Sequence, residues 1–278
     1  MAAPKLNNLN PGDDAIQVYA IGGGGFTQLD TAPNSDAMLE DYLLTLVPDV
    51  PELPKIGYVG HANGDNPNRI SAFYARFLGC AETSHLPLGA DASTARDFAA
   101  DLDIIYVSGG STKQMLQRWR NTGLGDVFIE AGRRGVILAG VSAGAICWFS
   151  ELLLGSADDG FVQVPGLGLI AGSACPHYDS EPERRDAYDK AIVAGSLEPG
   201  IAIDDGVAVH IMAGQICRII RARHGHAVFV KAGQDENFVR LALSPGFDLA
   251  GVTAKRIMPA QPNQTDRPDK LTGWSDDR

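Results

Sequence analysis

Short apolar runs alternate with amphipathic stretches over the first half of the chain. The runs are rich in β-branched residues and bounded by glycine, proline or charge, which predicts buried strands. The predicted strands are residues 16–21, 55–59, 104–107 and 136–139. The stretches between them carry apolar residues at helical spacing, and several begin with Ser, Thr, Asp or Asn in the N-cap position. The predicted helices are residues 36–46, 68–78, 93–100, 112–120 and 126–133.

The pattern changes after residue 160, where strand-like runs follow one another with only one clear helix among them. The predicted strands are residues 167–171, 201–203, 207–212, 216–220 and 227–231, and the helix is residues 183–194. Strands that alternate with helices through short connections form a parallel sheet covered on both faces. We therefore predict an α/β fold: a mostly parallel sheet flanked by helices on both faces, with extra C-terminal strands added as hairpins to its edge.

The sequence predicts one domain, because it contains neither internal repeats nor a central linker. Residues 1–14 are polar and interrupted by proline, and residues 258–278 are polar and contain proline. Segments of that composition bury too little apolar surface to fold by themselves. We predict a flexible segment over residues 1–14, one hydrolytic domain over residues 15–257 and a flexible polar tail over residues 258–278.

Composition and charge exclude several classes of partner. The 278 residues are 45% apolar and 21% charged, with a formal net charge of −11. Such an acidic protein repels phosphate backbones and anionic lipid, so neither nucleic acid nor membrane is an expected partner. No apolar run approaches the ~18 residues of a membrane span, and the N-terminus lacks a signal-peptide pattern, so a cytoplasmic protein is expected. Whether it forms a homo-oligomer is left open by the sequence.

The cysteines and histidines show no metal-binding pattern. The four cysteines lie far apart, without a C-x-x-C pair or a Cys/His cluster at zinc spacing. Each lies in or beside an apolar run, which predicts buried free thiols. We therefore expect neither a metal nor an organic cofactor.

The clearest chemical signal is a predicted strand that ends in Gly140-Val-Ser142-Ala-Gly144 and continues into an apolar, helix-forming stretch. In a nucleophile elbow, the serine occupies a strained strand-to-helix turn, and the flanking glycines allow neighbouring backbones to pass closely. Ser142 is the predicted nucleophile, and the Ala143 amide is one predicted donor to the oxyanion. The alternative is a tight turn with an incidental serine.

Two further turns follow predicted strands. The segment Ser108-Gly109-Gly110 emerges at the same carboxyl edge as the elbow, so the Gly110 amide is a second predicted oxyanion donor. His177, in Cys-Pro-His-Tyr, alone among the six histidines follows the elbow at a strand end, and is the predicted base. Its alternative is a structural loop histidine. The tetraglycine at 22–25 does not fit the dinucleotide-binding G-x-G-x-x-G spacing.

Six segments in this order resemble the aspartyl dipeptidase (peptidase E) and cyanophycinase-like serine peptidases, which share the fold of class I glutamine amidotransferases. They are AIGGGGF at 20–26, DIIYVSGGST at 103–112, LAGVSAGAICWF at 138–149, GLGLI at 166–170, CPHYDSEPERR at 175–185 and DDGVAVH at 204–210. The resemblance implies Ser142 as nucleophile, His177 as general base, Gly110 with Ala143 as oxyanion hole, and Arg184 or Arg185 as the cation that holds an acidic substrate side chain. It implies cleavage after an N-terminal aspartate.

The chain departs from the family pattern at two places. Ser111 stands where the glycine turn usually has asparagine, and Gly155 aligns with an aspartate that usually follows the nucleophile. Asp158 is the predicted partner that orients His177, with Asp159 or no carboxylate as the alternatives. Loss of such a carboxylate lowers kcat by about 10⁴ in a well-studied triad.

We predict a serine peptidase that acts on small, acidic peptides. Two alternatives stay open: an amidase or acyl transferase for a non-peptide amide, and a ligand-binding homologue with impaired catalysis, for which Gly155 is the motivation.

Overall fold

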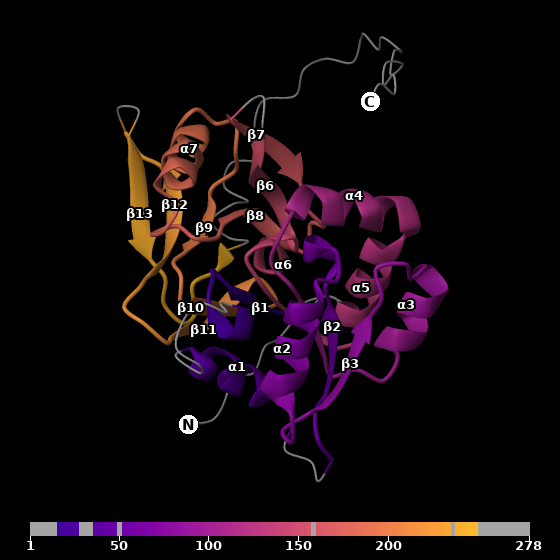
Figure 1. Cartoon of the computed structure of the whole chain (residues 1–278). Coiled ribbons are helices and arrows are strands. Elements are labelled where there is room, and N and C mark those ends of the chain that lie inside the picture. Colours follow the sequence, from indigo (N-terminus) through magenta and orange to yellow (C-terminus); the bar gives the residue numbers. More distant parts are fainter. Residues whose placement is uncertain (1–15, 28–35, 49–51, 157–159, 235–236, 250–278) are drawn as a thin grey trace, which may run out of the picture.

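The computed structural model describes residues 16–27, 36–48, 52–156, 160–234 and 237–249. Within them the chain forms two mixed sheets of seven and six strands, connected by seven α-helices and two short 3₁₀ helices (Figure 1). The predicted termini at 1–14 and 258–278, together with Asp158 and Asp159, lie outside these residues. None of the described helices is long and apolar enough to cross a membrane.

The first sheet is the parallel sheet that the sequence predicts, extended by an antiparallel hairpin. Its strands, in spatial order, are β11 (Gln215–Arg221), β10 (Val207–Met212), β1 (Gln17–Ile21), β5 (Ile137–Val141), β4 (Ile104–Val107), β2 (Lys55–Val59) and β3 (Glu82–Leu86). The five strands from β1 to β3 are parallel to their neighbours, whereas β10 is antiparallel to β1 and β11 to β10.

Alternate side chains of this sheet enter two different cores. Tyr19 and Ile21 of β1 pack with α1 (Ala37–Leu44) and α2 (Pro67–Phe77), whereas Val18 and Ala20 pack on the opposite face with the other helices. Those helices are α3 (Ala92–Ala99), α4 (Thr112–Thr122) and α5 (Leu124–Arg133). All four β1 side chains are fully buried. The period-two alternation of a strand thus buries both faces, and the predicted α/β fold is confirmed.

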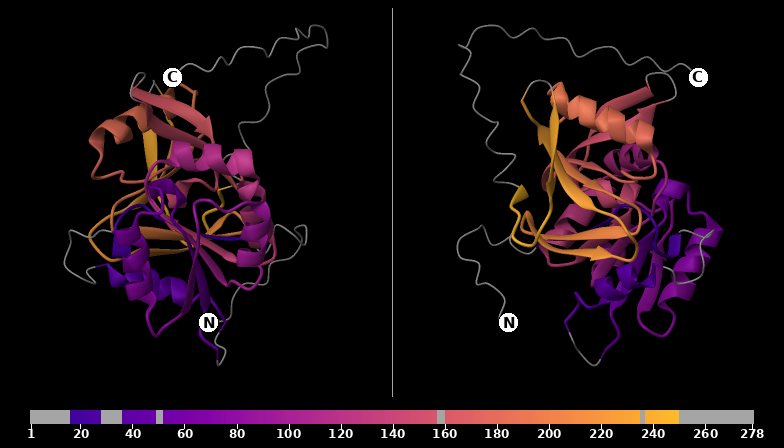
Figure 2. Two further views of the ribbon diagram at one scale, coloured as in Figure 1. Left: turned by 45° about the vertical axis from the view of Figure 1, so that its right-hand side comes forward. Right: turned by 90° about the vertical axis from the view of Figure 1, so that its left-hand side faces the viewer.

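The second sheet differs from the prediction, which placed all C-terminal strands on the edge of the first sheet. Its order is β13 (Phe238–Ala242), β12 (Ala227–Ala232), β9 (Gly200–Ile203), β8 (Ile170–Cys175), β6 (Phe149–Ser156) and β7 (Gly160–Pro165). One face shares the core of the first sheet through Leu152, Ile201 and Phe229, and α7 (Pro182–Val193) covers the other (Figure 2). Of the predicted C-terminal strands, only β10 and β11 extend the first sheet.

Local signals explain where several helices begin and end. Asn66 caps α2 by accepting hydrogen bonds from the amides of Asn68 and Arg69, and proline occupies the first turn. Ser111 caps α4 by accepting from the Gln114 amide, and α4 ends at Gly123 with φ 73°. The helix-forming stretch predicted after the elbow forms only the short helix α6 (Ala143–Ile146), because β6 begins at Phe149 within the same apolar run.

Candidate active site

Ser142 lies directly after β5 in a strained backbone conformation. Its φ of 53° and ψ of −111° are unusual for a residue other than glycine, and such a conformation costs about 1–3 kcal/mol. The two nearby glycines are required by close packing: a Cβ on Gly140 would lie 2.5 Å from the Gly144 carbonyl oxygen, and one on Gly144 would lie 2.1 Å from that of Val107. This geometry is that of a nucleophile elbow.

His177 brings its imidazole to the serine from the other sheet. It lies two residues beyond the end of β8, and its Nε2 is 2.9 Å from Ser142 Oγ. Its backbone φ is 52°, so the second partner of this pair also occupies a left-handed conformation. Both positions are those predicted from the sequence, and the fold brings the two side chains into hydrogen-bond contact.

Asp205 is the carboxylate that contacts His177. Its Oδ1 is 2.6 Å from His177 Nδ1, and both side chains are partly buried, with 14% and 23% exposed. Because an ionised carboxylate only accepts hydrogen bonds, Nδ1 carries the proton and Nε2 is left to accept from the serine hydroxyl. Burial alone would raise the pKa of Asp205, but the hydrogen bond and charge of His177, with Ser180 and Arg223, hold it below its ordinary value.

The position of Asp205 follows from the topology of the second sheet. β8 and β9 are parallel neighbours, and Asp205 lies two residues beyond the end of β9, as His177 does beyond β8. Carboxyl ends of adjacent parallel strands meet at one edge, so the two side chains meet there. Asp158, the partner expected from the sequence, lies outside the described residues, and Gly155 is part of β6 opposite Phe161 of β7.

The tetraglycine after β1 packs against the pair of His177 and Asp205. A Cβ on Gly23 would lie 1.9 Å from Asp205 Oδ1 and 2.6 Å from the His177 ring. The Gly23 carbonyl also accepts a hydrogen bond from the Gly206 amide at 2.8 Å. Glycine is needed here so that the backbone can lie directly against the two side chains, and this accounts for a motif that does not fit nucleotide binding.

The glycine turn after β4 lies beside Ser142. A Cβ on Gly109 would be 3.2 Å from Ser142 Cβ, and Gly110 has φ 143°. Asn63 supports the turn, because its Nδ2 donates to the Gly109 carbonyl at 3.3 Å, and the Ser111 amide donates to the Ala62 carbonyl at 2.7 Å. The Gly110 amide has no hydrogen-bond partner among the described residues, so it is available to a ligand.

A pocket of about 350 Å³ opens above these groups. It is lined by Gly24, Asn63, Asn66, Arg69, Gly109, Gly110, Val141, Ser142 and His177. Its size lies at the lower end of the range for small-ligand sites, which suits a short substrate. Nucleophile, imidazole and glycine turn therefore share one cavity.

Peptidase family S51 matches residues 19–219 of this chain. The chain belongs to this family. The "Uncharacterized peptidase YgaJ" of Bacillus subtilis (strain 168) is 39% identical over 212 residues, which span 75% of this chain and 89% of that protein. This S51 chain is therefore a serine-type peptidase.

Two solved structures share the S51 chain's fold. One is a peptidase from an acI-B1 Actinobacterium, with a TM-score of 0.54, 19% identity, and coverage of 83% of this chain and 98% of that chain. The other is a putative peptidase E protein from Listeria monocytogenes EGD-e, with a TM-score of 0.54, 17% identity, and coverage of 74% and 98%. At these identities the likeness concerns the fold.

The arginines expected to bind substrate in this S51 peptidase are paired with acidic neighbours. Arg184 forms an ion pair with Glu181 at 2.9 Å and Arg185 with Asp186 at 3.0 Å, both in or next to the start of α7. Neither side chain lines the pocket. Arg69, from the first turn of α2, is the cation that does. In the sequence, Arg69 is one polar residue of an amphipathic helix, and no local pattern marks it as a ligand-binding residue.

Two other histidines, His61 and His210, are buried and do not line the pocket. Trp119 Nε1 donates to His61 Nδ1 at 3.0 Å, so His61 Nε2 carries the proton toward the Pro87 carbonyl at 3.2 Å. Burial lowers the pKa of His61, and it lowers that of His210 to about 4. Both imidazoles are therefore neutral packing groups near pH 7.

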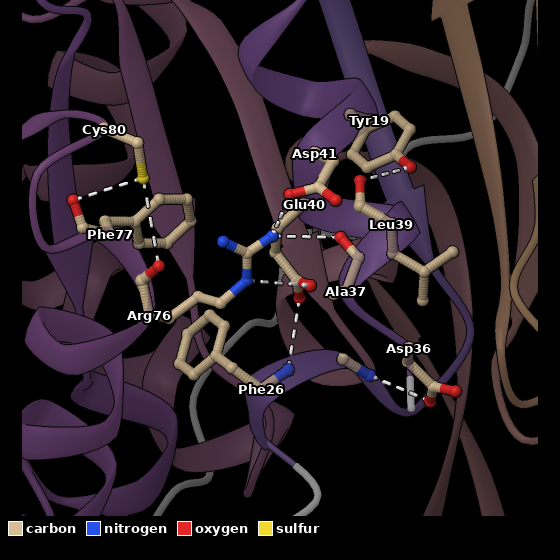
Figure 3. Close-up of polar contacts among 11 residues, drawn as sticks. Tyr19, Phe26, Asp36, Ala37, Leu39, Glu40, Asp41, Arg76, Phe77 and Cys80 are labelled. Atoms are coloured by element: carbon tan, nitrogen blue, oxygen red, sulfur yellow. Dashed lines mark hydrogen bonds and ion pairs between the residues drawn. The ribbon is translucent and has the colours of Figure 1, made fainter. Parts of the chain in front are cut away.

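Two acidic side chains of the α1 region hold the loop that follows the tetraglycine. Glu40 Oε1 accepts from the Phe26 amide at 3.3 Å, and Asp36 Oδ2 accepts from the Gly25 amide at 3.2 Å (Figure 3). Arg76 of α2 lies beside this group, with its Nε 3.7 Å from Glu40 Oε2. The short helix η1 (Gly25–Thr27) is thus fastened to both helices on this face of the sheet.

Glu40 is expected to make the stability of the S51 peptidase depend on pH. Its side chain is fully buried, and burial raises its pKa from 4.5 to about 7, although Arg76 and the Phe26 amide act in the opposite direction. Because the folded-state pKa is the higher one, the stability linked to this group is present below pH 4.5 and is lost as the pH rises to about 7. The loss amounts to about 3 kcal/mol.

The variant Glu40→Gln keeps an oxygen acceptor for Phe26 but does not titrate. The free energy of unfolding of the variant, relative to wild type, should therefore rise by about 3 kcal/mol between pH 4.5 and pH 8. Urea unfolding at both pH values measures this difference. If the free energies of unfolding of the two proteins changed in parallel with pH, Glu40 would ionise in the folded protein as easily as in the unfolded chain.

Proposed function

We infer that this chain is a serine peptidase that cleaves small peptides after an N-terminal aspartate. The observation that carries the proposal is the hydrogen-bonded series from Ser142 Oγ through His177 to Asp205 beside a small pocket. The aspartate preference rests on the resemblance of its motifs to the aspartyl dipeptidases. A putative peptidase E protein is among the solved structures that share the fold.

In the proposed reaction, Ser142 Oγ attacks the carbonyl carbon of the scissile bond while its proton passes to His177 Nε2. The amides of Gly110 and Ala143 donate hydrogen bonds to the oxyanion. His177 then gives the proton to the leaving amine as the carbon–nitrogen bond breaks. Water hydrolyses the resulting ester on Ser142, and its proton returns through His177. Asp205 keeps the imidazole in the required tautomer throughout.

The contact between Asp205 and His177 bears on one of the two alternatives. Asp205 supplies the carboxylate whose apparent absence motivated a binding protein with impaired catalysis, so that alternative loses its basis in Gly155. An amidase for a non-peptide amide would use the same three side chains. Its separation from a peptidase therefore requires substrates rather than geometry.

Hydrolysis of a dipeptide panel tests the proposal. Wild type is expected to cleave Asp-Leu with a larger kcat/KM than Leu-Leu, and to react at Ser142 with a fluorophosphonate probe. Labelling without hydrolysis of any dipeptide, followed by cleavage of a non-peptide amide from a metabolite panel, would favour the amidase. Equal rates on Asp-Leu and Leu-Leu would keep the peptidase but remove the aspartate preference.

A further inference from the structure

Arg69 is the arginine that lines the pocket, and the proposed reaction gives it no role. It lines the cavity together with Ser142 and His177, and no carboxylate is among the described residues that line it. A guanidinium in such surroundings offers a planar set of donors that matches a carboxylate in two hydrogen bonds. The pocket thus carries positive charge in a protein whose net charge is −11.

Three other arginines are engaged by carboxylates. Arg223 donates to Asp36 Oδ1 at 2.9 Å and to Oδ2 at 2.6 Å. Arg184 and Arg185 are paired with acidic neighbours at the start of α7. Arg69 forms no ion pair with any described residue, and its side chain is half-buried. It is therefore the cation that a ligand can bind without displacing an internal partner.

The backbone of Arg69 is held in place at the edge of the pocket. Its amide donates to Asn66 Oδ1 at 3.4 Å, and Asn63 Oδ1 accepts from the Asn66 amide at 3.1 Å. Asn63 Nδ2 also contacts Gly109, so the first turn of α2 and the glycine turn share one polar network. A ligand bound by Arg69 would thus be fixed relative to the groups that face the scissile carbonyl, which is what positioning for catalysis requires.

We propose that Arg69 binds a carboxylate of the dipeptide substrate and thereby contributes to the binding of that substrate. This rests on the proposed function and replaces Arg184 and Arg185 in the role that the family resemblance implied for them. Two carboxylates of a dipeptide could occupy the site: the acidic side chain before the scissile bond, or the C-terminal carboxylate of the leaving residue. Their chemistry is the same, and ligands that carry only one of them distinguish the two.

Three compounds form the test: Asp-Leu with both carboxylates, Asn-Leu with only the terminal one, and Asp-leucinamide with only that of the side chain. For Arg69→Gln, kcat/KM on Asp-Leu should fall by roughly 10- to 100-fold, mainly through KM, as expected for loss of a charge-assisted pair. The fall should be shared by one single-carboxylate compound and absent for the other. Arg69→Lys should restore part of the loss, because it keeps the charge without the planar donors.

Arg96→Gln, at an exposed position of α3, is the matched control and should leave all three rates unchanged. Equal losses on all three compounds in Arg69→Gln, or no loss on any, would overturn the proposal. A selective loss in Arg184→Gln together with an unaffected Arg69→Gln would return the role to α7.

Binding separates this proposal from the proposed function. Calorimetry with Ser142→Ala measures the affinity of the same compounds without hydrolysis, and the double variant with Arg69→Gln should bind the relevant compound roughly 10- to 100-fold more weakly. If wild type cleaves nothing but this difference persists, the peptidase proposal fails and the carboxylate site stands. If Ser142→Ala binds none of the three compounds, the carboxylate site is refuted.

Discussion

Replacing Ser142 by alanine is expected to lower kcat for Asp-Leu hydrolysis by roughly 10⁶-fold, as removal of the nucleophile does in a comparable triad. Ser142 Oγ lies 2.9 Å from His177 Nε2 and is the atom that forms the acyl-enzyme in the proposed reaction. Without it, His177 can activate only water, and the amides of the glycine turn and the elbow supply what catalysis remains. A continuous assay of leucine release measures the change.

The fold should be unaffected, because alanine adopts the left-handed backbone of position 142 at about the same cost as serine. Equal melting temperatures of wild type and Ser142→Ala would check this. Ser93→Ala, at an exposed position of α3, is the matched control and should retain full activity. Retention of hydrolysis by Ser142→Ala on every Asp-containing dipeptide would exclude Ser142 as the nucleophile.

Replacing Asp205 by asparagine is expected to lower kcat by about 10⁴-fold while KM changes little. The asparagine amide can donate to His177 Nδ1, which places the imidazole proton on Nε2 and removes the acceptor for the Ser142 hydroxyl. The low pKa of Asp205 keeps its carboxylate ionised below the ordinary range for aspartate. The fall in rate on the acidic side of the pH–rate profile should therefore not reflect the protonation of Asp205.

Two further variants make this result specific. Asp126→Asn, exposed in the first turn of α5, should retain the wild-type rate. Asp158→Asn tests the partner expected from the sequence. A fall of several orders of magnitude in Asp158→Asn, with Asp205→Asn still active, would show that the enzyme uses a different carboxylate from the one that contacts His177 here.

The parallel sheet could be predicted because its central strands are continuous apolar runs. β4 and β5 are buried along their whole length, so their apolar composition identifies them as strands of a buried parallel sheet. β3, at the edge of the sheet, reads Glu-Thr-Ser-His-Leu and carries no such signal. β6 begins at Phe149, within the apolar run that follows the elbow, where periodicity cannot separate a buried strand from a buried helix.

Local patterns located two of the three hydrogen-bonded side chains, and pairing between distant segments placed the third. Ser142 and His177 each follow an apolar strand within a recognisable motif. Asp205 also stands after a strand, but its contact with His177 depends on β8 pairing with β9, which no local signal encodes. The contact between Asp205 and His177 could not be predicted because the strand order of the second sheet was not known. Once its strand order is known, a carboxylate two residues beyond β9 is the natural candidate.

The distribution of the three side chains also bears on protein synthesis. Ser142, His177 and Asp205 follow β5, β8 and β9, so the last of them is added when about three quarters of the chain has been made. A nascent chain that ends before β9 carries the serine and the imidazole without the carboxylate. The hydrogen-bonded series of Ser142, His177 and Asp205 can therefore form only after β9 and the residues that follow it have been translated.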